Sequence, residues 1–143
     1  MNTTEIAQLL VNQPGFQGVY SSDKLPKNPR LLVCNTDPSW KRGEHWIAIY
    51  VDKHGRGDYF DSFGRRPDKH FERYLNANCN SWTFNKKRLQ SSISSFCGFY
   101  VVLFVVLRVR GFDLNKLFKN DTGYNDWRVH LFICKLKKKI LKN

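Results

Sequence analysis

The longest apolar stretch of the chain, residues 96–107, constrains the fold more than any other feature. It contains 12 residues, too few to span a bilayer, so the segment must be buried within the domain. Its periodicity fits a buried strand as well as a buried helix. The length of the run, and the serines Ser94 and Ser95 that can cap a helix in front of it, favour a buried helix over Cys97–Val109.

The bulk composition fits one globular domain over residues 1–143. Hydrophobic residues make up 41% and aromatic residues 15% of the chain, enough for a packed core. The N-terminus lacks the basic segment and apolar run of a secretory signal. We therefore expect a soluble, intracellular protein that does not contact membranes, and we expect it to be a monomer.

A β-hairpin is the clearest element before the apolar run. His45, Ile47, Ile49 and Val51 alternate with residues of the opposite face, which predicts a strand over residues 45–51. A glycine-rich turn then returns the chain into a second strand over residues 58–62. A hairpin places the start of one strand beside the end of the next, so His45 and Asp61 should lie close together. Their register is uncertain by one or two residues.

The remaining elements complete an α+β prediction. Apolar spacing predicts a helix over residues 2–11 and a short strand over residues 31–34, followed by a polar loop over residues 35–44. A further strand is expected over residues 81–84. Two more helices are expected. The first has Pro67 in its first turn and an apolar face formed by Phe71, Tyr74 and Leu75. The second begins at about Asp126, with Trp127, Leu131 and Cys134 facing inward and lysines facing outward.

The four cysteines, Cys34, Cys79, Cys97 and Cys134, lie far apart and contain no C-x-x-C pair. This spacing disfavours a zinc site and a secreted disulfide scaffold. We therefore expect reduced thiols in an intracellular setting and no bound metal.

The charge balance is strongly positive. Twenty-four Lys and Arg residues against 12 Asp and Glu residues give a net charge of +12. Such a surface attracts polyanions, and as a whole it favours nucleic-acid contact, although any single cluster could simply be a solvated face. The residues expected to make this contact are Arg65, Arg66, Lys86, Lys87, Arg88, Lys137, Lys138 and Lys139, and further basic clusters include Lys41 with Arg42.

Four residues could together form the centre of a thiol protease: His45, Asp61, Gln90 and Cys97. A position at a helix N-terminus beside an imidazole lowers a thiol pKa from about 8.5 to roughly 3.5–7.5. Cys97 would then be the nucleophile and His45 its general base. Asp61 would orient the imidazole, and the Gln90 amide and the Cys97 N–H would stabilise the oxyanion. Gly98 would leave room for a substrate backbone.

Each of these residues alone has a simpler interpretation. A cysteine in an apolar run is most often a small buried hydrophobe, and a histidine at a strand edge often has a satisfied ring. The segment Asp61–Gly64 reads as a turn, and Gln90 as an ordinary surface amide. Their order and spacing together favour the catalytic interpretation.

The order H-W, then F-D-S-F-G, then Q followed seven positions later by C-G-F resembles the adenovirus protease family. It also resembles the proteases of Polinton/Maverick-type transposons and virophages and, more distantly, the SUMO-deconjugating proteases. The similarity runs from about Phe16 to the helix after Cys97, and it includes the approach Gly43–Trp46 to the histidine. Six residues separate Gln90 from Cys97, as in the adenovirus type; the SUMO-protease type usually has one fewer.

The resemblance implies a papain-like, adenain-like α+β fold in which a small mixed sheet packs against a central buried helix that carries the nucleophile. By position it makes Cys97 the nucleophile, His45 the base, Gln90 an oxyanion donor and Asp61 the orienting acid, where adenovirus enzymes have Glu. Trp46 would pack beside the histidine, or it could be a plain core aromatic.

The resemblance also implies a biological role. Members of the family need no cofactor for the chemistry, and they cut precursor proteins of the virus particle after small residues, typically Gly. Capsid or core-protein maturation is therefore expected here, with viral structural precursors as substrates. The expected locations are the host nucleus or viral factory and the virion.

Members of the family are stimulated by DNA and by a short basic peptide that forms a disulfide with one enzyme cysteine. Cys79, 11 positions before Gln90, lies where that cysteine occurs, and the alternative is a free or structural thiol. The chain is shorter than the adenovirus enzymes after the Cys97 helix, which counts against activation by a peptide.

Three other functions remain open at this point. The first is a SUMO or ubiquitin-like protein protease, and the second is an effector-type acetyltransferase of related fold that uses the same kind of His-acid-Cys set. The third is a non-catalytic, basic virion protein that binds nucleic acid.

Overall fold

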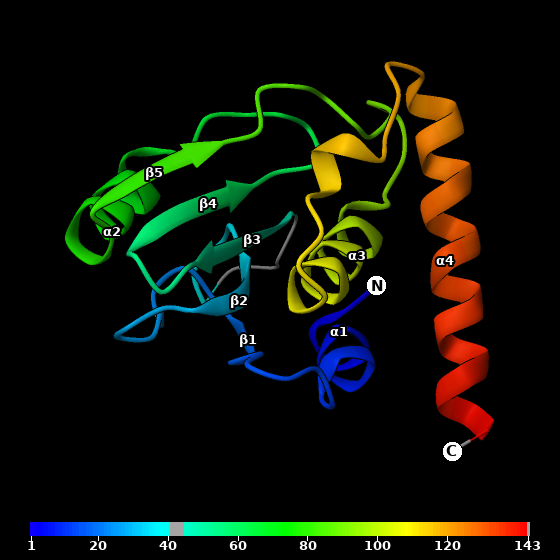
Figure 1. Cartoon of the computed structure of the whole chain (residues 1–143), viewed down its shortest axis with the longest axis horizontal. Coiled ribbons are helices and arrows are strands. Elements are labelled where there is room, and N and C mark those ends of the chain that lie inside the picture. The colour runs from blue at the N-terminus through cyan, green and yellow to red at the C-terminus, as the bar shows by residue number, and fades with distance from the viewer. Residues whose placement is uncertain (41–44, 143) are drawn as a thin grey trace.

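The computed structural model describes residues 1–40 and 45–142, and a five-stranded mixed sheet forms its centre (Figure 1). The strands lie side by side in chain order: β1 (Val19–Tyr20), β2 (Leu31–Asn35), β3 (Trp46–Val51), β4 (Arg56–Phe60) and β5 (Ser81–Phe84). β3 is antiparallel to both of its neighbours, whereas β1 and β5 add in parallel at the two edges. The predicted hairpin is therefore the middle of the sheet.

Both faces of the central strands are covered, which explains their apolar sequences. Ile47 and Ile49 of β3 pack with the apolar side of α2 (Lys69–Asn78), whereas Trp46 and Ala48 face the opposite core. All five residues of β2 are buried. This arrangement matches the predicted alternation along β3, with both sets of side chains inside the protein rather than one set in water.

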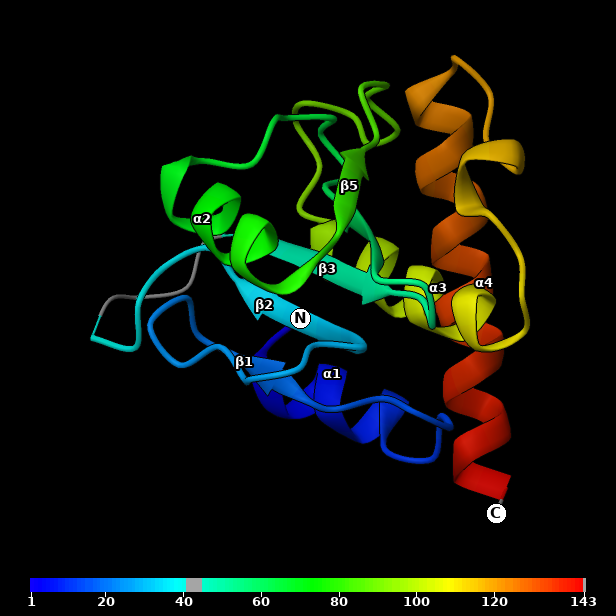
Figure 2. The same cartoon turned by 60° about the vertical axis from the view of Figure 1, so that its left-hand side comes forward.

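Three helices cover the other face of the sheet (Figures 1 and 2). The central one, α3 (Cys97–Val109), packs against β3 and is buried along most of its length. It lies between the sheet and α4 (Thr122–Lys142), whereas α1 (Thr3–Leu10) lies beside α3 and also contacts β1. A short 3-10 turn, η1 (Leu114–Lys116), connects α3 to α4. The apolar run is thus a buried helix, as predicted, and the α+β class is confirmed.

The last helix differs from its prediction in both its start and its inward face. It begins at Thr122, and its buried positions are Asn125, Asp126, Val129 and Ile133. The side chains of Trp127 and Leu131 are 57% and 39% exposed. The helix carries two apolar stripes, and polar Asn125 and Asp126 select the inward one because both hydrogen-bond to buried partners.

Two smaller corrections concern the termini of elements. Pro67 precedes α2 instead of occupying its first turn, because the carboxylate of Asp68 caps the helix by accepting from the Phe71 N–H. β4 begins and ends two residues earlier than predicted, so Asp61 lies in the turn that follows the strand. Lys41, Arg42, Gly43 and Glu44 lie outside the described residues. In the part of the chain that is described, no helix is long and apolar enough to cross a membrane.

Candidate active site

The β3–β4 hairpin brings His45 and Asp61 together. His45 directly precedes β3 and Asp61 directly follows β4, and the pairing of Ala48 with Phe60 sets their register. The distance between His45 Nε2 and Asp61 Oδ1 is 2.8 Å, and the Asp61 residue is only 3% exposed. The buried Asp61 carboxylate therefore pairs with Nε2. Nδ1 is the ring nitrogen that this carboxylate does not engage.

Cys97 is the first residue of α3, as predicted, and it lies beside this imidazole. The His45 side chain and the backbone N–H groups of Trp46 and Gly98 lie close enough to the sulfur to lower the pKa of the Cys97 thiol. The expected serine cap is wrong: Phe96 is the N-cap, without a side-chain hydrogen bond. The hydroxyl of Ser94 is buried and has no hydrogen-bond partner among the described residues.

The pKa values of the thiol and the imidazole shift in opposite directions. Burial raises the pKa of Cys97, but the hydrogen bond with His45, the Trp46 N–H and the charge of the imidazolium outweigh burial, and the net pKa is lowered. Burial lowers the pKa of His45, whereas the hydrogen bond and charge of Asp61, together with the thiolate, raise it to about 9. These shifts favour a thiolate–imidazolium pair at neutral pH.

The Gln90 side chain also lies at the site formed by His45, Asp61 and Cys97, and the residue is fully buried. The Ser62 hydroxyl donates to Gln90 Oε1 at 2.5 Å, which turns the amide nitrogen to the other side. That nitrogen donates one proton to the Ser94 carbonyl at 2.9 Å and has a second proton to offer. Gln90 lines the same cleft as Cys97, so the geometry is compatible with an oxyanion donor.

The turn that carries Asp61 is fixed by a residue that sequence reasoning missed, Asn85. This buried side chain accepts from the Asp61 N–H at 2.9 Å and donates to the Asp61 carbonyl at 2.6 Å. Its only signal in the sequence is its place directly after β5, which pairs with β4. Asn85 therefore acts as a positioning residue for the carboxylate.

Gly64 explains the glycine of the F-D-S-F-G motif. Its φ is +71°, and a Cβ there would lie 2.8 Å from the backbone of Lys87 and 2.9 Å from that of Arg88. Immediately after this contact, the N–H groups of Leu89 and Gln90 donate to the Ser62 carbonyl. The turn of Asp61 and the segment of Gln90 are thus held directly against each other.

The Gln90 segment is also supported from α3 and α4. The Tyr100 hydroxyl donates to Asp126 at 2.8 Å and to the Leu89 carbonyl at 3.2 Å. The Asn125 amide donates to the same carbonyl at 3.1 Å. These contacts explain why α4 buries two polar residues, and they connect its position to that of the oxyanion candidate.

The cleft in front of these groups has a volume of about 590 Å³, and Trp46, Phe63 and Arg65 form part of its wall. Gly98 also lines the cleft and has no side chain that would extend into it. A Cβ there would lie 3.1 Å from Met1 Cβ and 3.5 Å from the Trp46 ring. The glycine therefore keeps this wall open, and Met1 is the neighbour that a side chain at this position would crowd.

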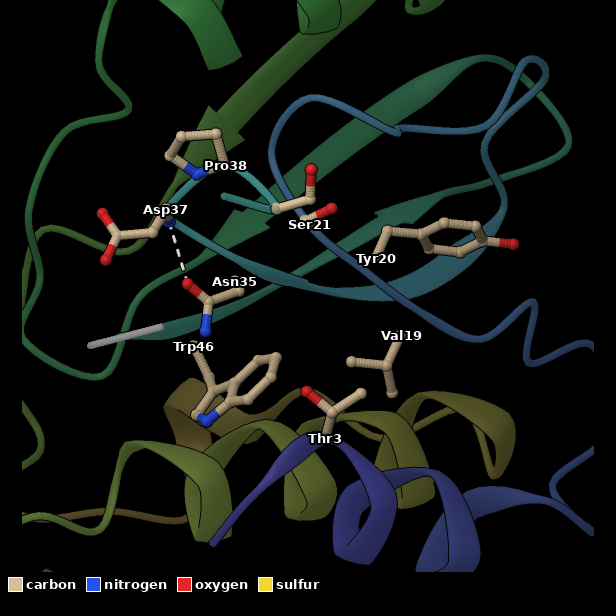
Figure 3. A pocket seen from close by; sticks show the side chains of 9 residues that line it. Thr3, Val19, Tyr20, Ser21, Asn35, Asp37, Pro38 and Trp46 are labelled. Atoms are coloured by element: carbon tan, nitrogen blue, oxygen red, sulfur yellow. Dashed lines mark hydrogen bonds between the residues drawn. The ribbon is translucent and has the colours of Figure 1, made fainter. Parts of the chain in front are cut away.

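Trp46 also lines a second, polar hollow of about 260 Å³ (Figure 3). Thr3, Tyr20, Ser21 and Asn35 line the hollow, and the side-chain Oδ1 of Asn35 accepts from the Asp37 N–H at 2.8 Å.

The remaining residues of interest lie farther out. Cys79 is half-buried beneath β4, and burial raises the pKa of its thiol. Arg66 and Lys86 lie over the Trp82 and Phe84 rings beside β5. The three lysines Lys137, Lys138 and Lys139 are exposed near the end of α4, apart from β5 in both views (Figures 1 and 2). In the described part of the chain, His, Cys, Asp and Glu side chains form no group of three that could hold a metal ion.

Comparison with known proteins gives one related sequence and several related structures. No known family profile matches the chain. A protein of Acanthamoeba polyphaga mimivirus, R355, whose name describes it as a thiol protease, is 26% identical over 105 residues. The match covers 66% of this chain and 34% of R355, so the chain spans about a third of the length of that relative.

Two solved structures illustrate the fold relationship. The ASFV pS273R protease has a TM-score of 0.59 and 21% identity, covering 90% of this chain and 64% of that one. The SUMO protease Ulp1 has a TM-score of 0.51 and 14% identity, covering 95% and 78%. The chain therefore has the Ulp1-like cysteine protease fold, and its predicted resemblance to adenain-like and SUMO-protease-related enzymes is confirmed at the level of the fold.

Proposed function

We propose that this chain is a cysteine endopeptidase with Cys97 as nucleophile and His45 as acid–base catalyst. The observation that carries the proposal is the thiol at the first residue of α3, which shares a cleft with an imidazole whose Nε2 lies 2.8 Å from a buried carboxylate. The lowered pKa of the thiol favours a thiolate, and the raised pKa of the imidazole favours an imidazolium. Thiol proteolysis requires these two charge states.

The proposed reaction begins with attack of the Cys97 thiolate on the carbonyl carbon of the scissile amide. The negative charge that develops on the carbonyl oxygen is stabilised by the Cys97 N–H, free at the start of the helix, and by the second amide proton of Gln90. His45 then donates its proton to the leaving amine, and the C–N bond breaks to leave a thioester. A water molecule, deprotonated by His45, hydrolyses the thioester and regenerates the thiol.

Selective alkylation tests the nucleophile. At pH 6, iodoacetamide should label Cys97 before the other thiols, because burial raises the pKa of both Cys34 and Cys79. Peptide mapping by mass spectrometry gives the site, and Cys97→Ala should lose both the label and peptide cleavage. Equal labelling of the cysteines, or cleavage by Cys97→Ala, would reject the assignment.

The substrate proposed is a precursor protein of a virus particle, cut after a small residue such as Gly. Two facts support it: the sequence relative is a mimivirus protein named as a thiol protease, and one fold neighbour is the ASFV protease. Cleavage of a library of peptides that vary only at the residue before the scissile bond would test this; a preference for large side chains would contradict it.

A ubiquitin-like protein protease is the second candidate, because the chain has the Ulp1 fold. Parallel assays with SUMO or ubiquitin fusions and with short Gly-containing peptides separate the two candidates. Turnover of the fusions alone would favour the second candidate. Efficient cleavage of short peptides supports the endopeptidase.

DNA contact is a separate proposal supported by the net charge of +12 and by the exposed basic residues beside β5 and on α4. Peptide cleavage should accelerate on added duplex DNA, and the effect should disappear at high salt. Cys79 stays a prediction for a peptide disulfide. Its raised pKa makes it a slow thiol, so the disulfide would form only with a partner that binds next to it.

A further inference from the structure

Two arginines share one aromatic ring at the edge of the cleft. The Phe63 ring packs against His45 with ring centroids 5.1 Å apart. The guanidinium of Arg65 lies 4.8 Å from the centre of the Phe63 ring, and that of Arg88 lies 5.7 Å from it. Two positive charges are therefore arranged around a ring that contacts the catalytic imidazole.

The positions of both arginines are fixed by the backbone around them. They come from different segments, and the two segments touch at Gly64, where no side chain fits against Lys87 and Arg88. The Ser62 carbonyl accepts two N–H groups from the residues after Arg88. This contact keeps the two guanidiniums near one ring without either of them binding an acidic side chain.

The two charges have no counter-charge in the described part of the chain. The ion pairs found there involve neither Arg65 nor Arg88, and both side chains are exposed. Arg66, the neighbour of Arg65, differs because it lies 3.4 Å from the Glu72 carboxylate. Guanidinium groups match the geometry of a carboxylate, so the unpaired pair is suited to bind one.

We propose that Arg65 and Arg88 bind an acidic side chain of the substrate close to the scissile bond, so that the enzyme prefers Asp or Glu there. The inference rests on the proposed peptidase function. Arg65 lines the same cleft as Cys97, so whatever enters the cleft meets its charge. This location favours an acidic peptide over nucleic acid as the ligand of these two residues.

The experiment compares quenched fluorescent peptides that share one Gly-containing core. In one series, Glu, Gln or Lys occupies the position two residues before the scissile bond. In the other series, the same three residues occupy the position two residues after it. The measured quantity is the ratio of kcat/KM for the Glu peptide to that for the Gln peptide. The proteins are the wild type, the double variant Arg65→Gln/Arg88→Gln, and Arg66→Gln as the matched control.

In one of the two series the wild type should prefer Glu over Gln by about tenfold, the sum expected of two exposed charge contacts. The Lys peptide should be the poorest of that series. The ratio should fall toward one in the double variant, stay unchanged in Arg66→Gln, and decline for the wild type as salt is raised. A ratio near one in both series for the wild type, or an equal loss in Arg66→Gln, would overturn the inference.

Two binding measurements identify the ligand of the two arginines independently of cleavage. Peptide binding to Cys97→Ala, followed by fluorescence polarisation, gives the Glu-to-Gln ratio without turnover, so failure of the peptidase function alone leaves the inference testable. Binding of duplex DNA to the same arginine variants provides the last arm. Loss of DNA binding with an unchanged Glu-to-Gln ratio would assign Arg65 and Arg88 to nucleic acid and reject the proposal.

Discussion

Replacement of Asp61 by Asn should move only one side of the pH profile of cleavage. Asn keeps an oxygen near His45 Nε2 but removes the negative charge that lies 2.8 Å from it. A hydrogen bond to a charged group contributes about 1.5–3 kcal/mol and a neutral one about 0.5–1.5 kcal/mol. The difference is on the order of 1 to 1.5 kcal/mol, and one pKa unit corresponds to about 1.4 kcal/mol.

The pKa of His45, raised to about 9 in the native protein, should therefore fall by about one unit in Asp61→Asn. His45 must be protonated to donate to the leaving amine, so activity is lost as pH rises through this pKa. The alkaline limb of kcat/KM should accordingly move to lower pH by about one unit. The acid limb reports formation of the Cys97 thiolate and should stay in place.

The assay is kcat/KM for a Gly-containing peptide between pH 5 and 10, with the rate of Cys97 alkylation as an independent measure of the thiolate. Asp52→Asn provides a matched control, because this carboxylate pairs with Arg56 at the opposite end of the same hairpin. Asp61→Asn should also lower the overall rate, because the imidazole is less well oriented without the carboxylate. This loss of rate does not change the pH at which either limb of the profile lies. An alkaline limb that stays near its native position would refute the role assigned to Asp61.

Three further predictions follow from the surrounding contacts. Gln90→Ala should lower kcat by about 10²–10³ with little change in KM if the amide stabilises the oxyanion, which steady-state kinetics measures; an unchanged kcat would remove it from the mechanism. Gly64→Ala should destabilise the fold in urea unfolding by more than Gly111→Ala, because both have positive φ, costing about 1–2 kcal/mol, but only Gly64 meets a backbone within 3 Å. Asn85→Ala should reduce the free energy of unfolding by about 1–3 kcal/mol and also lower kcat, since the Asp61 N–H loses its buried acceptor.

The sequence was most informative where periodicity and length agreed. The alternation over residues 45–51 and the apolar run after Phe96 gave β3 and α3 almost to the residue, and together they determined where His45 and Cys97 would lie. The turn between β3 and β4 is short, so the nearness of His45 and Asp61 followed from hairpin geometry alone. The roles assigned to these side chains stay predictions.

The misses have a common physical cause: they depend on contacts between distant segments. The inward face of α4 is decided by buried hydrogen bonds from Asn125 and Asp126 to the Gln90 segment and to Tyr100, and two equivalent apolar stripes cannot reveal that choice. The same holds for Asn85, whose partner is 24 residues away. Gln90, predicted as an oxyanion donor, would by itself be read as a surface amide, and its burial was not predictable because its partner Ser62 is 28 residues away.

The order in which the site is assembled along the chain has a consequence for folding. The imidazole and its carboxylate are 16 residues apart and meet through a local hairpin, whereas the sulfur lies on a helix that comes later in the chain and packs against the sheet. Local contacts form sooner than distant ones because less loop entropy is lost. We therefore expect the contact of His45 with Asp61 to form before Cys97 reaches them, so the proposed activity would require the completed tertiary structure.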